Sequence, residues 1–160
     1  MTQDGGLDDR QQRAWRSFYR MQEVLRARLE QQLQATSGMS NADYTVLVVL
    51  YDAPGQRLRQ FELGEVVQWE KSRLHHQLSR MCQRGLVERG PDPRAPRSRA
   101  RYVTLTPAGR QALLAAAPAH SREVKRLVID RLTDDELDQL GALSTRILDA
   151  LDAAKPSDGS

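Results

Sequence analysis

The segment from about Lys71 to Arg84 constrains the fold more than any other part of this 160-residue chain. Its apolar residues Leu74, Leu78 and Met81 recur at spacings of four and three, which places them on one side of an α-helix. The remaining surface then carries polar and basic side chains, namely Ser72, Arg73, His75, His76, Gln77, Ser79 and Arg80. The spacing therefore predicts a helix that buries a narrow apolar stripe and presents a basic face.

The segments on either side of this helix restrict its setting. A short helix is predicted over about residues 61–67, with a turn between it and the basic helix. Gly85 suits the C-terminal cap of the basic helix, and residues 86–89 and 102–105 then alternate as two strands around a loop rich in proline and arginine. This order predicts a helix-turn-helix followed directly by a basic β-hairpin.

Two amphipathic helices are predicted before that unit. Apolar residues recur at helical spacing from Trp15 to Leu33, and the pattern stops near Gly38. Ser40 can cap a second helix, which ends at a turn that includes Pro54. The N-terminal third is therefore expected to be a long helix followed by a shorter one.

The C-terminal third also has helical signals. Thr106 and Pro107 suit the N-cap and first position of a helix, because the N–H that proline lacks would be unpaired there. We expect this helix to bend or restart at Pro118. Residues 133–136 fit a capping box for a last helix, whose apolar stripe runs over residues 137–151. The predicted fold is mainly α, with about six helices and a small β-hairpin wing.

The predicted domain organisation follows from these elements. A winged helix-turn-helix lobe is expected over residues 40–106, and disordered tails over residues 1–9 and 155–160. The helices over residues 10–36 and 107–153 carry apolar stripes without obvious partners in so small a lobe, and such stripes usually mark an interface. The alternative is that the terminal helices pack on each other within one chain. We expect them to be dimerisation helices of a homodimer.

The charge of the chain is concentrated in its centre. The whole chain has a net charge of only +3. Residues 56–102 hold eleven basic residues against five acidic ones, a net charge of +6, so the rest of the chain carries −3. A solvated basic face is the alternative reading of such a run. Because the charge coincides with the helix-turn-helix and the hairpin, we interpret it as a surface for a polyanion such as DNA.

Several other classes of protein are disfavoured. No run approaches the roughly 18 apolar residues of a membrane span, and the N-terminus is unlike a signal peptide, so we expect a cytoplasmic protein with no membrane partner. Cys82 is the single cysteine, and the adjacent His75 and His76 diverge too far on a helix to chelate one ion, which argues against a metal site. No nucleophile-elbow, phosphate-loop or zinc-protease motif is present, so neither an enzyme nor a cofactor is predicted.

The chain resembles the MarR (multiple antibiotic resistance regulator) family of winged helix-turn-helix transcription factors. The resemblance runs from about residue 15 to residue 151 and is strongest in residues 71–74, 78–87 and 92–109. It implies a homodimer in which the N- and C-terminal helices interlock. It also implies two recognition helices in successive major grooves of a near-palindromic operator, with two wings reaching the minor grooves.

The resemblance assigns roles to individual residues. The implied recognition-helix contacts are Lys71, Ser72, Arg73, His75, His76, Gln77 and Arg80. The implied wing contact is Arg94, Arg97 or Arg99, since arginine suits a narrow, electronegative minor groove. The chain departs from the usual pattern at Pro96, where many relatives have glycine, and at Glu70, which suits the helix dipole but would repel a phosphate.

The resemblance also raises the question of control. Relatives often bind small aromatic or anionic ligands in a cleft, which Trp15, Tyr19, Tyr44 and Trp69 are candidates to line, although aromatic residues at helical spacing are more often core. A redox-responsive regulator that uses Cys82 is a further alternative. A protein-binding adaptor with a winged fold is a third, but its interface core would be depleted in charge. We predict a dimeric, sequence-specific regulator of transcription that binds double-stranded DNA, acting as a repressor released by a small-molecule ligand.

Overall fold

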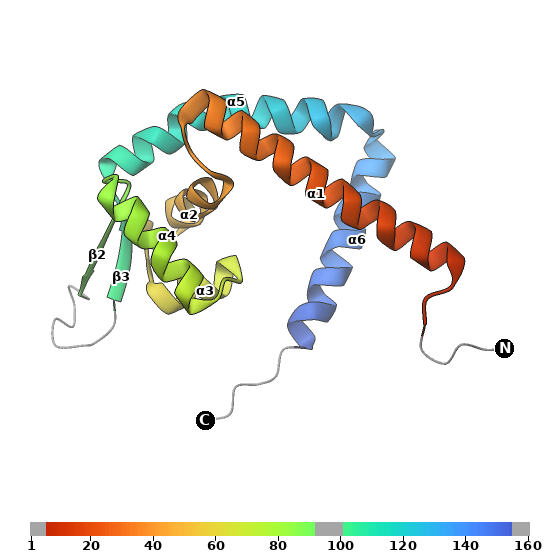
Figure 1. Cartoon of the computed structure of the whole chain (residues 1–160), viewed down its shortest axis with the longest axis horizontal. Coiled ribbons are helices and arrows are strands. Elements are labelled where there is room, and N and C mark those ends of the chain that lie inside the picture. The colour runs from red at the N-terminus through yellow and green to blue at the C-terminus, as the bar shows by residue number, and fades with distance from the viewer. Residues whose placement is uncertain (1–5, 92–100, 155–160) are drawn as a thin grey trace. The chain divides into compact units, whose positions relative to one another are not determined.

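The computed structural model describes residues 6–91 and 101–154 (Figure 1). The chain forms two compact units, residues 1–121 and 122–160. The elements, in chain order, are α1 (Asp9–Ser37), α2 (Asn41–Asp52), the 3₁₀ turn η1 (Pro54–Gln56), β1 (Arg57–Arg59), α3 (Gln60–Val67), α4 (Lys71–Gln83), β2 (Val87–Pro91), β3 (Arg101–Leu105), α5 (Pro107–Leu127), the 3₁₀ turn η2 (Ile129–Arg131) and α6 (Asp134–Ala153). The mainly helical winged fold predicted from the sequence is confirmed.

Side-chain caps explain where the first helices begin. Asp8 accepts a hydrogen bond from the Gln11 backbone N–H while the Gln11 side chain accepts one from the Asp8 backbone, so α1 starts inside the predicted disordered tail. Ser40 caps α2 in the same reciprocal way with Asp43, as predicted. Between them Gly38 adopts φ +67°, a left-handed conformation that glycine enters without steric cost.

The sheet contains one strand more than the sequence predicted. Within the described ranges it has three antiparallel strands in the order β1-β3-β2. β1 pairs with β3 so that Leu58 faces Val103, and β2 pairs with β3 so that Val87 faces Leu105. The three residues of β1 are too short a run to show alternation, and their pairing is non-local. The hairpin prediction is therefore correct but incomplete.

The core of the winged lobe buries the apolar stripe of α4. Leu74, Leu78 and Met81 are buried together with residues of α2, α3 and the sheet. The start of α5 lies so close to the segment between α4 and β2 that a Cβ at Gly109 would meet the Leu86 carbonyl oxygen at 2.0 Å. Thr106 Oγ1 accepts a hydrogen bond from the Gly109 N–H at 2.9 Å, which confirms the predicted N-cap. α4 is thus fixed from several sides.

The last two long helices differ from the sequence expectation in one respect. α5 continues through Pro118 to Leu127 as one α-helix, so the helix does not restart at Pro118. The alternative, a bend at Pro118, stays a prediction. The capping box at the start of α6 is confirmed, because Thr133 and Glu136 exchange hydrogen bonds between side chains and backbone. None of the twenty residues of α6 is buried, although all of them are described. Within the described ranges no helix is long and apolar enough to cross a membrane.

Candidate nucleic-acid interface

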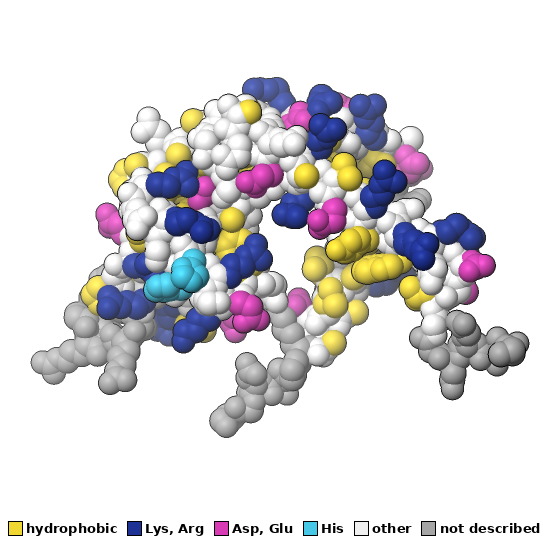
Figure 2. All heavy atoms as spheres, viewed as in Figure 1, with side chains coloured by type: hydrophobic (Ala, Val, Ile, Leu, Met, Phe, Trp, Pro, Cys, Tyr) yellow, Lys and Arg dark blue, Asp and Glu magenta, His cyan; other side chains and the backbone are white. Residues whose placement is uncertain are grey.

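The outward face of α4 is polar and basic. Its buried stripe fixes the helix against the core, and the side chains of Lys71, Ser72, Arg73, His75, His76 and Arg80 are exposed on the other side. In Figure 2 the histidine side chains over α4 lie among lysine and arginine side chains. Six of the seven recognition-helix residues named from the sequence therefore share one exposed face.

Gln77 is the exception, and its predicted place on the exposed face is wrong. Only 3% of its surface is exposed. Its Nε2 donates to Asp43 Oδ1 at 2.7 Å, and its Oε1 accepts from Arg80 Nη2 at 2.6 Å. Gln77 lies three residues after Leu74, so a helical stripe at that spacing passes through it. A buried partner on α2 makes a polar residue acceptable there.

Asp43 is a buried carboxylate that the sequence did not single out. Its Oδ2 accepts from Arg84 Nη1 at 2.7 Å and from the Ser40 backbone N–H at 2.9 Å. Burial by itself would raise the pKa of Asp43, but the hydrogen bonds from Ser40 and the charge of Arg84 outweigh it, so the pKa lies below its usual value. Asp43 is therefore held as a carboxylate with partners on both oxygens.

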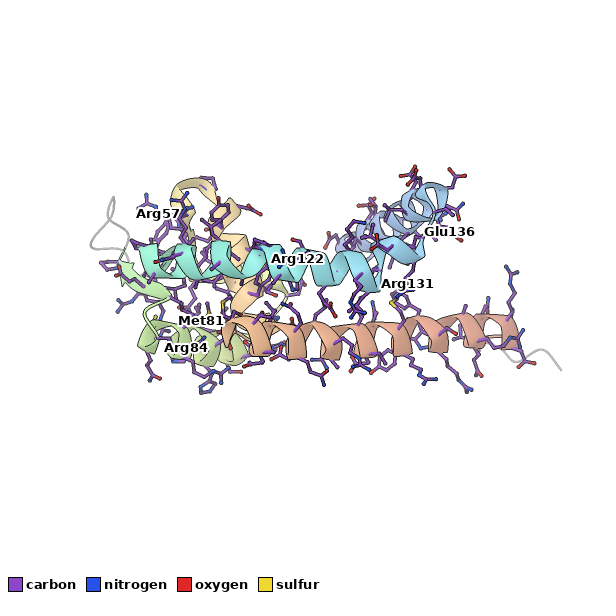
Figure 3. All side chains as sticks on the ribbon, turned by 90° about the horizontal axis from the view of Figure 1, so that it is seen from above. Arg57, Met81, Arg84, Arg122, Arg131 and Glu136 are labelled. Atoms are coloured by element: carbon purple, nitrogen blue, oxygen red, sulfur yellow. The ribbon has the colours of Figure 1, made fainter. Side chains whose placement is uncertain are left out.

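Arg84 connects this carboxylate to the end of α1. Besides its ion pair with Asp43, Arg84 Nη2 donates to the Gly38 carbonyl oxygen at 3.4 Å. Figure 3 shows Arg84 at the end of α4, beside the end of α1. The last carbonyl groups of a helix lack intrahelical partners, so a guanidinium there is favourable. The corner between α1 and α2 is thereby bonded to the C-terminal end of α4.

Arg73 is preorganised by an aromatic ring. Its guanidinium lies 4.5 Å from the centroid of the half-buried Trp69 ring. A cation over the face of tryptophan is attracted by the ring quadrupole, and the contact also reduces the rotamer freedom of a long side chain. Trp69 was predicted to line a ligand cleft, and here it supports a side chain of the exposed α4 face.

Arg89 on β2 supports the middle of the same face. Its Nη2 donates to Ser79 Oγ at 2.8 Å, and its Nη1 lies 3.3 Å from His75 Nδ1. A guanidinium can only donate, so Nδ1 of His75 accepts and the ring proton lies on Nε2. His75 therefore offers an N–H donor on its far side. From the sequence, Arg89 is only one of the basic residues of the central segment, because no local pattern predicts that its side chain contacts α4.

The N-terminal end of α4 opens onto a depression in the surface. Its lining comprises Gln60, Glu70, Lys71, Ser72, His75 and His76. Glu70 is the N-cap residue, but its side chain makes no capping hydrogen bond. Backbone N–H groups at a helix N-terminus favour the binding of anions. The negative charge of the Glu70 carboxylate repels anions. The depression therefore combines donors with one acidic side chain.

A second cluster of arginine lies at the base of the wing. Arg57 and Arg59 lie 5.4 and 5.9 Å from the centroid of the Tyr102 ring, and Arg59 Nε donates to the Tyr102 hydroxyl at 3.2 Å. This cluster places positive charge on β1, the edge strand of the sheet. The predicted wing contacts Arg94, Arg97 and Arg99 lie outside the described residues.

The four predicted ligand-cleft residues occupy three settings. Trp15 and Tyr19 contact each other on the exposed half of α1, with ring centroids 6.2 Å apart. Tyr44 packs against His120, with centroids 4.4 Å apart, and the His120 Nδ1–H donates to Gln32 Oε1 at 3.3 Å. Burial lowers the pKa of His120 and raises that of Tyr44. Trp69, the fourth residue, packs against Arg73. The four residues therefore take part in three separate side-chain contacts.

No group of three or more His, Cys, Asp or Glu side chains within residues 6–91 and 101–154 could hold a metal ion. Cys82 is a free, half-buried thiol next to the stripe of α4. The exposed side of α4 carries mainly hydrogen-bond donors and positive charge, with the acidic side chain of Glu70 at its N-terminal end.

A helix-turn-helix with a three-stranded wing and a supported basic helix defines the class of winged helix-turn-helix proteins. The MarR family model matches residues 37–98. The chain is 32% identical to Sco3205 of Streptomyces coelicolor, a MarR family transcriptional regulator solved in complex with DNA, covering 98% of this chain and 96% of that one with a TM-score of 0.88. It is also 32% identical to AbsC of Streptomyces coelicolor, another MarR family regulator, covering 94% and 99% with a TM-score of 0.85.

A curated relative agrees with these structures. The transcriptional regulator HosA of Escherichia coli O111:H- is 27% identical over 135 residues, which are 84% of this chain and 96% of that one. The chain belongs to the MarR family of transcriptional regulators.

Proposed function

We propose that the chain is a homodimeric regulator that binds duplex DNA in a sequence-specific manner and represses transcription by occluding the bound site. The observation that carries this proposal is the exposed face of α4, where polar and basic side chains stand on a helix fixed by its buried stripe. The similarity to Sco3205, a protein solved with DNA, supports the same use of the fold.

The exposed face of α4 has the chemistry that the major groove requires. That groove is about 12 Å wide and admits one α-helix, whose side chains reach the base edges. The proposed contacts are Lys71, Ser72, Arg73, His75, His76 and Arg80. One arginine side chain can donate two hydrogen bonds to the edge of a guanine, and the Nε2–H of His75 is a further donor. Gln77 is not among the proposed contacts, because it is on the buried side of α4 and bonded to Asp43.

The wing is proposed to contact the backbone and the minor groove. Arg57 and Arg59 lie at its base on β1, and Arg101 is exposed where β3 begins. Arg94, Arg97 and Arg99 remain the proposed minor-groove residues from the sequence, since narrow minor grooves attract arginine. Together these arginine residues would neutralise phosphates and make the affinity depend on salt.

Dimerisation is proposed through the exposed apolar stripes of the terminal helices. On α1, Trp15, Phe18, Tyr19, Met21 and Val24 are between 40% and 56% exposed, and on α6, Leu140, Leu143, Ile147, Leu148 and Leu151 are between 39% and 61% exposed. Large apolar side chains at such density usually face a partner. A dimer also places two recognition helices on half-sites about 34 to 36 Å apart, which doubles the contacts.

Release by a small aromatic or anionic ligand completes the proposal. A ligand that binds one arrangement of the dimer better than another would shift the population away from the form that binds DNA. Tyr44 and His120 are candidate contacts because they join α1, α2 and α5 through ring packing and the Gln32 hydrogen bond. Trp15 and Tyr19 are the second candidate pair, on the exposed face of α1.

Selection of bound duplexes tests this function. The purified chain would be incubated with a randomised library of duplexes, and bound sequences would be recovered and amplified over several rounds. We expect enrichment of a near-palindromic sequence and complexes that contain two chains per duplex by sedimentation. A pool that stays random after selection would contradict sequence-specific binding, and one chain per duplex would contradict the dimer. Repeating the binding with a panel of small aromatic carboxylates tests release.

A further inference from the structure

A line of hydrogen bonds crosses the winged lobe from α2 to the exposed face of α4. It begins at the buried Asp43 carboxylate, passes through the buried Gln77 amide and ends at the guanidinium of the exposed Arg80. The two contacts of the amide are 2.7 and 2.6 Å long. An exposed arginine on the proposed reading face is therefore held from inside the protein.

The chemistry of the two end groups fixes the orientation of the Gln77 amide. A carboxylate only accepts hydrogen bonds, so the amide nitrogen must face Asp43. A guanidinium only donates, so the amide oxygen must face Arg80. Rotation of the amide by half a turn would place two acceptors together at one end and two donors at the other. Gln77 consequently has one stable orientation, and it presents an acceptor to Arg80.

The carboxylate at the inner end is itself held in place. Asp43 Oδ2 is bonded to Arg84 and to the Ser40 backbone, which leaves Oδ1 for Gln77. Gln77 and Arg80 are one helical turn apart, so the helical backbone brings their side chains together and the hydrogen bond between them fixes the position of the guanidinium. An arginine without such a partner loses rotamer freedom when it docks, whereas one already bonded loses less.

We propose that Asp43 and Gln77 are positioning residues that aim Arg80 at the major groove, and that Arg80 discriminates between DNA sequences. The proposal rests on the proposed function, since it requires that α4 reads DNA. One N–H of Arg80 is engaged with Gln77, and the other guanidinium donors remain for a base edge. Asp43 and Gln77 affect binding only through Arg80.

The test uses the full-length chain with two probes. The first is the duplex enriched by the wild-type chain from a randomised library, and the second is a scrambled duplex of equal length and composition. The variants are Gln77→Met, which keeps the size of the side chain but loses both hydrogen bonds, Arg80→Ala and the double variant. Gln83→Met is the matched control, because Gln83 is exposed on the same helix. Thermal unfolding establishes that each variant is folded.

The measured quantity is the preference for the enriched duplex, expressed as the ratio of the two dissociation constants. We expect Arg80→Ala to reduce this preference on the order of tenfold. Gln77→Met should reduce it about threefold to tenfold, with nearly unchanged affinity for the scrambled duplex. The double variant should match Arg80→Ala, and Gln83→Met should match the wild type. A residue that only stabilises the fold would leave the preference unchanged.

Each contrary outcome has a definite meaning. Full preference in Gln77→Met, or additive losses in the double variant, would overturn the positioning role. Full preference in Arg80→Ala would overturn its role in discrimination while leaving the proposed function intact. Failure to enrich any duplex with the wild-type chain would instead overturn the proposed function.

A second variant covers the case in which Gln77→Met does not fold. Asp43→Asn has the same shape but places donors against Arg84 and the Ser40 N–H if it still accepts from Gln77. We expect it to lower the preference about threefold in the wild-type background and not at all in the Arg80→Ala background. Wild-type preference in a folded Asp43→Asn chain would remove Asp43 from the positioning role.

Discussion

α4 and α6 are both amphipathic helices, but their apolar stripes have opposite fates. The stripe of α4, at Leu74, Leu78 and Met81, is buried in the core of its own lobe. No residue of the α6 stripe is buried. Leu137 is half-buried, and the stripe residues from Leu140 to Leu151 are exposed, with Ile147 at 53%. Amphipathic spacing alone therefore predicts that a face will be buried, without telling whether the same chain buries it.

The difference separates two tasks within one chain. α4 is fixed by its apolar side, so its polar side is free to meet a ligand in a defined orientation. α6 carries four acidic residues in its first five positions and an apolar stripe without a buried residue, which suits contact with another surface. α4, whose apolar stripe is buried within its own lobe, is the helix proposed to read DNA. α6, whose apolar stripe has no buried residue, is the helix proposed to join two chains.

The largest expected effect comes from truncating the buried stripe. Leu78→Ala should lower the free energy of unfolding by about 2 to 5 kcal/mol, because it removes buried methyl groups and leaves a cavity. Leu148→Ala on α6 should change it by no more than about 0.5 kcal/mol at protein concentrations where the chain is monomeric. Urea unfolding followed by circular dichroism measures both. Equal losses in the two variants would contradict the contrast between the helices.

The next effect concerns the exposed stripe. Ile147→Asp should weaken dimerisation by about 2 to 4 kcal/mol, roughly 30- to 1000-fold, because a carboxylate would be buried unpaired at the interface. Thr145→Asp is the control, since Thr145 lies on the opposite side of α6 and is exposed. Sedimentation equilibrium gives the dissociation constants. A monomeric wild-type chain, or equal effects of the two variants, would contradict the proposed dimer interface on α6.

A smaller effect is expected on the polar side of α4. Arg73→Ala should reduce affinity for the enriched duplex by about 1 to 3 kcal/mol if Arg73 reads a base. Arg110→Ala is a matched control, because Arg110 also lies over an aromatic ring, that of Tyr51, but belongs to α5. Fluorescence anisotropy with labelled duplex measures both affinities. Unchanged affinity in Arg73→Ala would remove this residue from the proposed contacts.

A weaker effect is a dependence of stability on pH. The pKa of Asp43 is lower in the folded chain than its usual value, so its contribution to stability is present above that value and is lost as the pH falls through the folded pKa. We expect the difference in free energy of unfolding between wild type and Asp43→Asn to shrink as the pH of the experiment is lowered from 5 to 2. Urea unfolding at each pH measures this difference. A difference independent of pH would show that the Asp43 charge is not what anchors α4.

The corresponding group on α6 sharpens this contrast. Hydrogen bonds from the Thr133 backbone and side chain lower the pKa of Glu136, which is exposed. The direction of the pH dependence is therefore the same as for Asp43, but solvent screens an exposed carboxylate. We expect a smaller change in Glu136→Gln than in Asp43→Asn in the same titration. A larger change would reverse the assignment of the buried anchor to α4.

Local signals account for what the sequence could predict. Caps such as Ser40 and Thr133, and the spacing of Leu74, Leu78 and Met81, depend on residues within one or two turns of each other. They located the helices and six exposed residues of the α4 face. Such features need no knowledge of the tertiary arrangement, so they can be predicted from the sequence.

The missed features depend on partners far away in the chain. Gln77 is buried because Asp43, 34 residues earlier, accepts its hydrogen bond. β1 exists because Leu58 pairs opposite Val103. Pro118 did not restart α5, which continues for nine more residues to Leu127. In the first two cases a polar residue or a three-residue run has no periodic signal of its own, so only the folded arrangement identifies it.

The central claim is that α4 presents a sequence-reading surface, and equilibrium binding as a function of salt tests it most directly. The wild-type chain would be titrated against the enriched and scrambled duplexes between 50 and 200 mM NaCl, the chosen range of the experiment. Affinity for both should fall steeply as salt rises, because phosphate contacts release counterions. The enriched duplex should remain preferred by about a thousandfold or more. Equal affinities for the two duplexes, or a flat response to salt, would contradict the account.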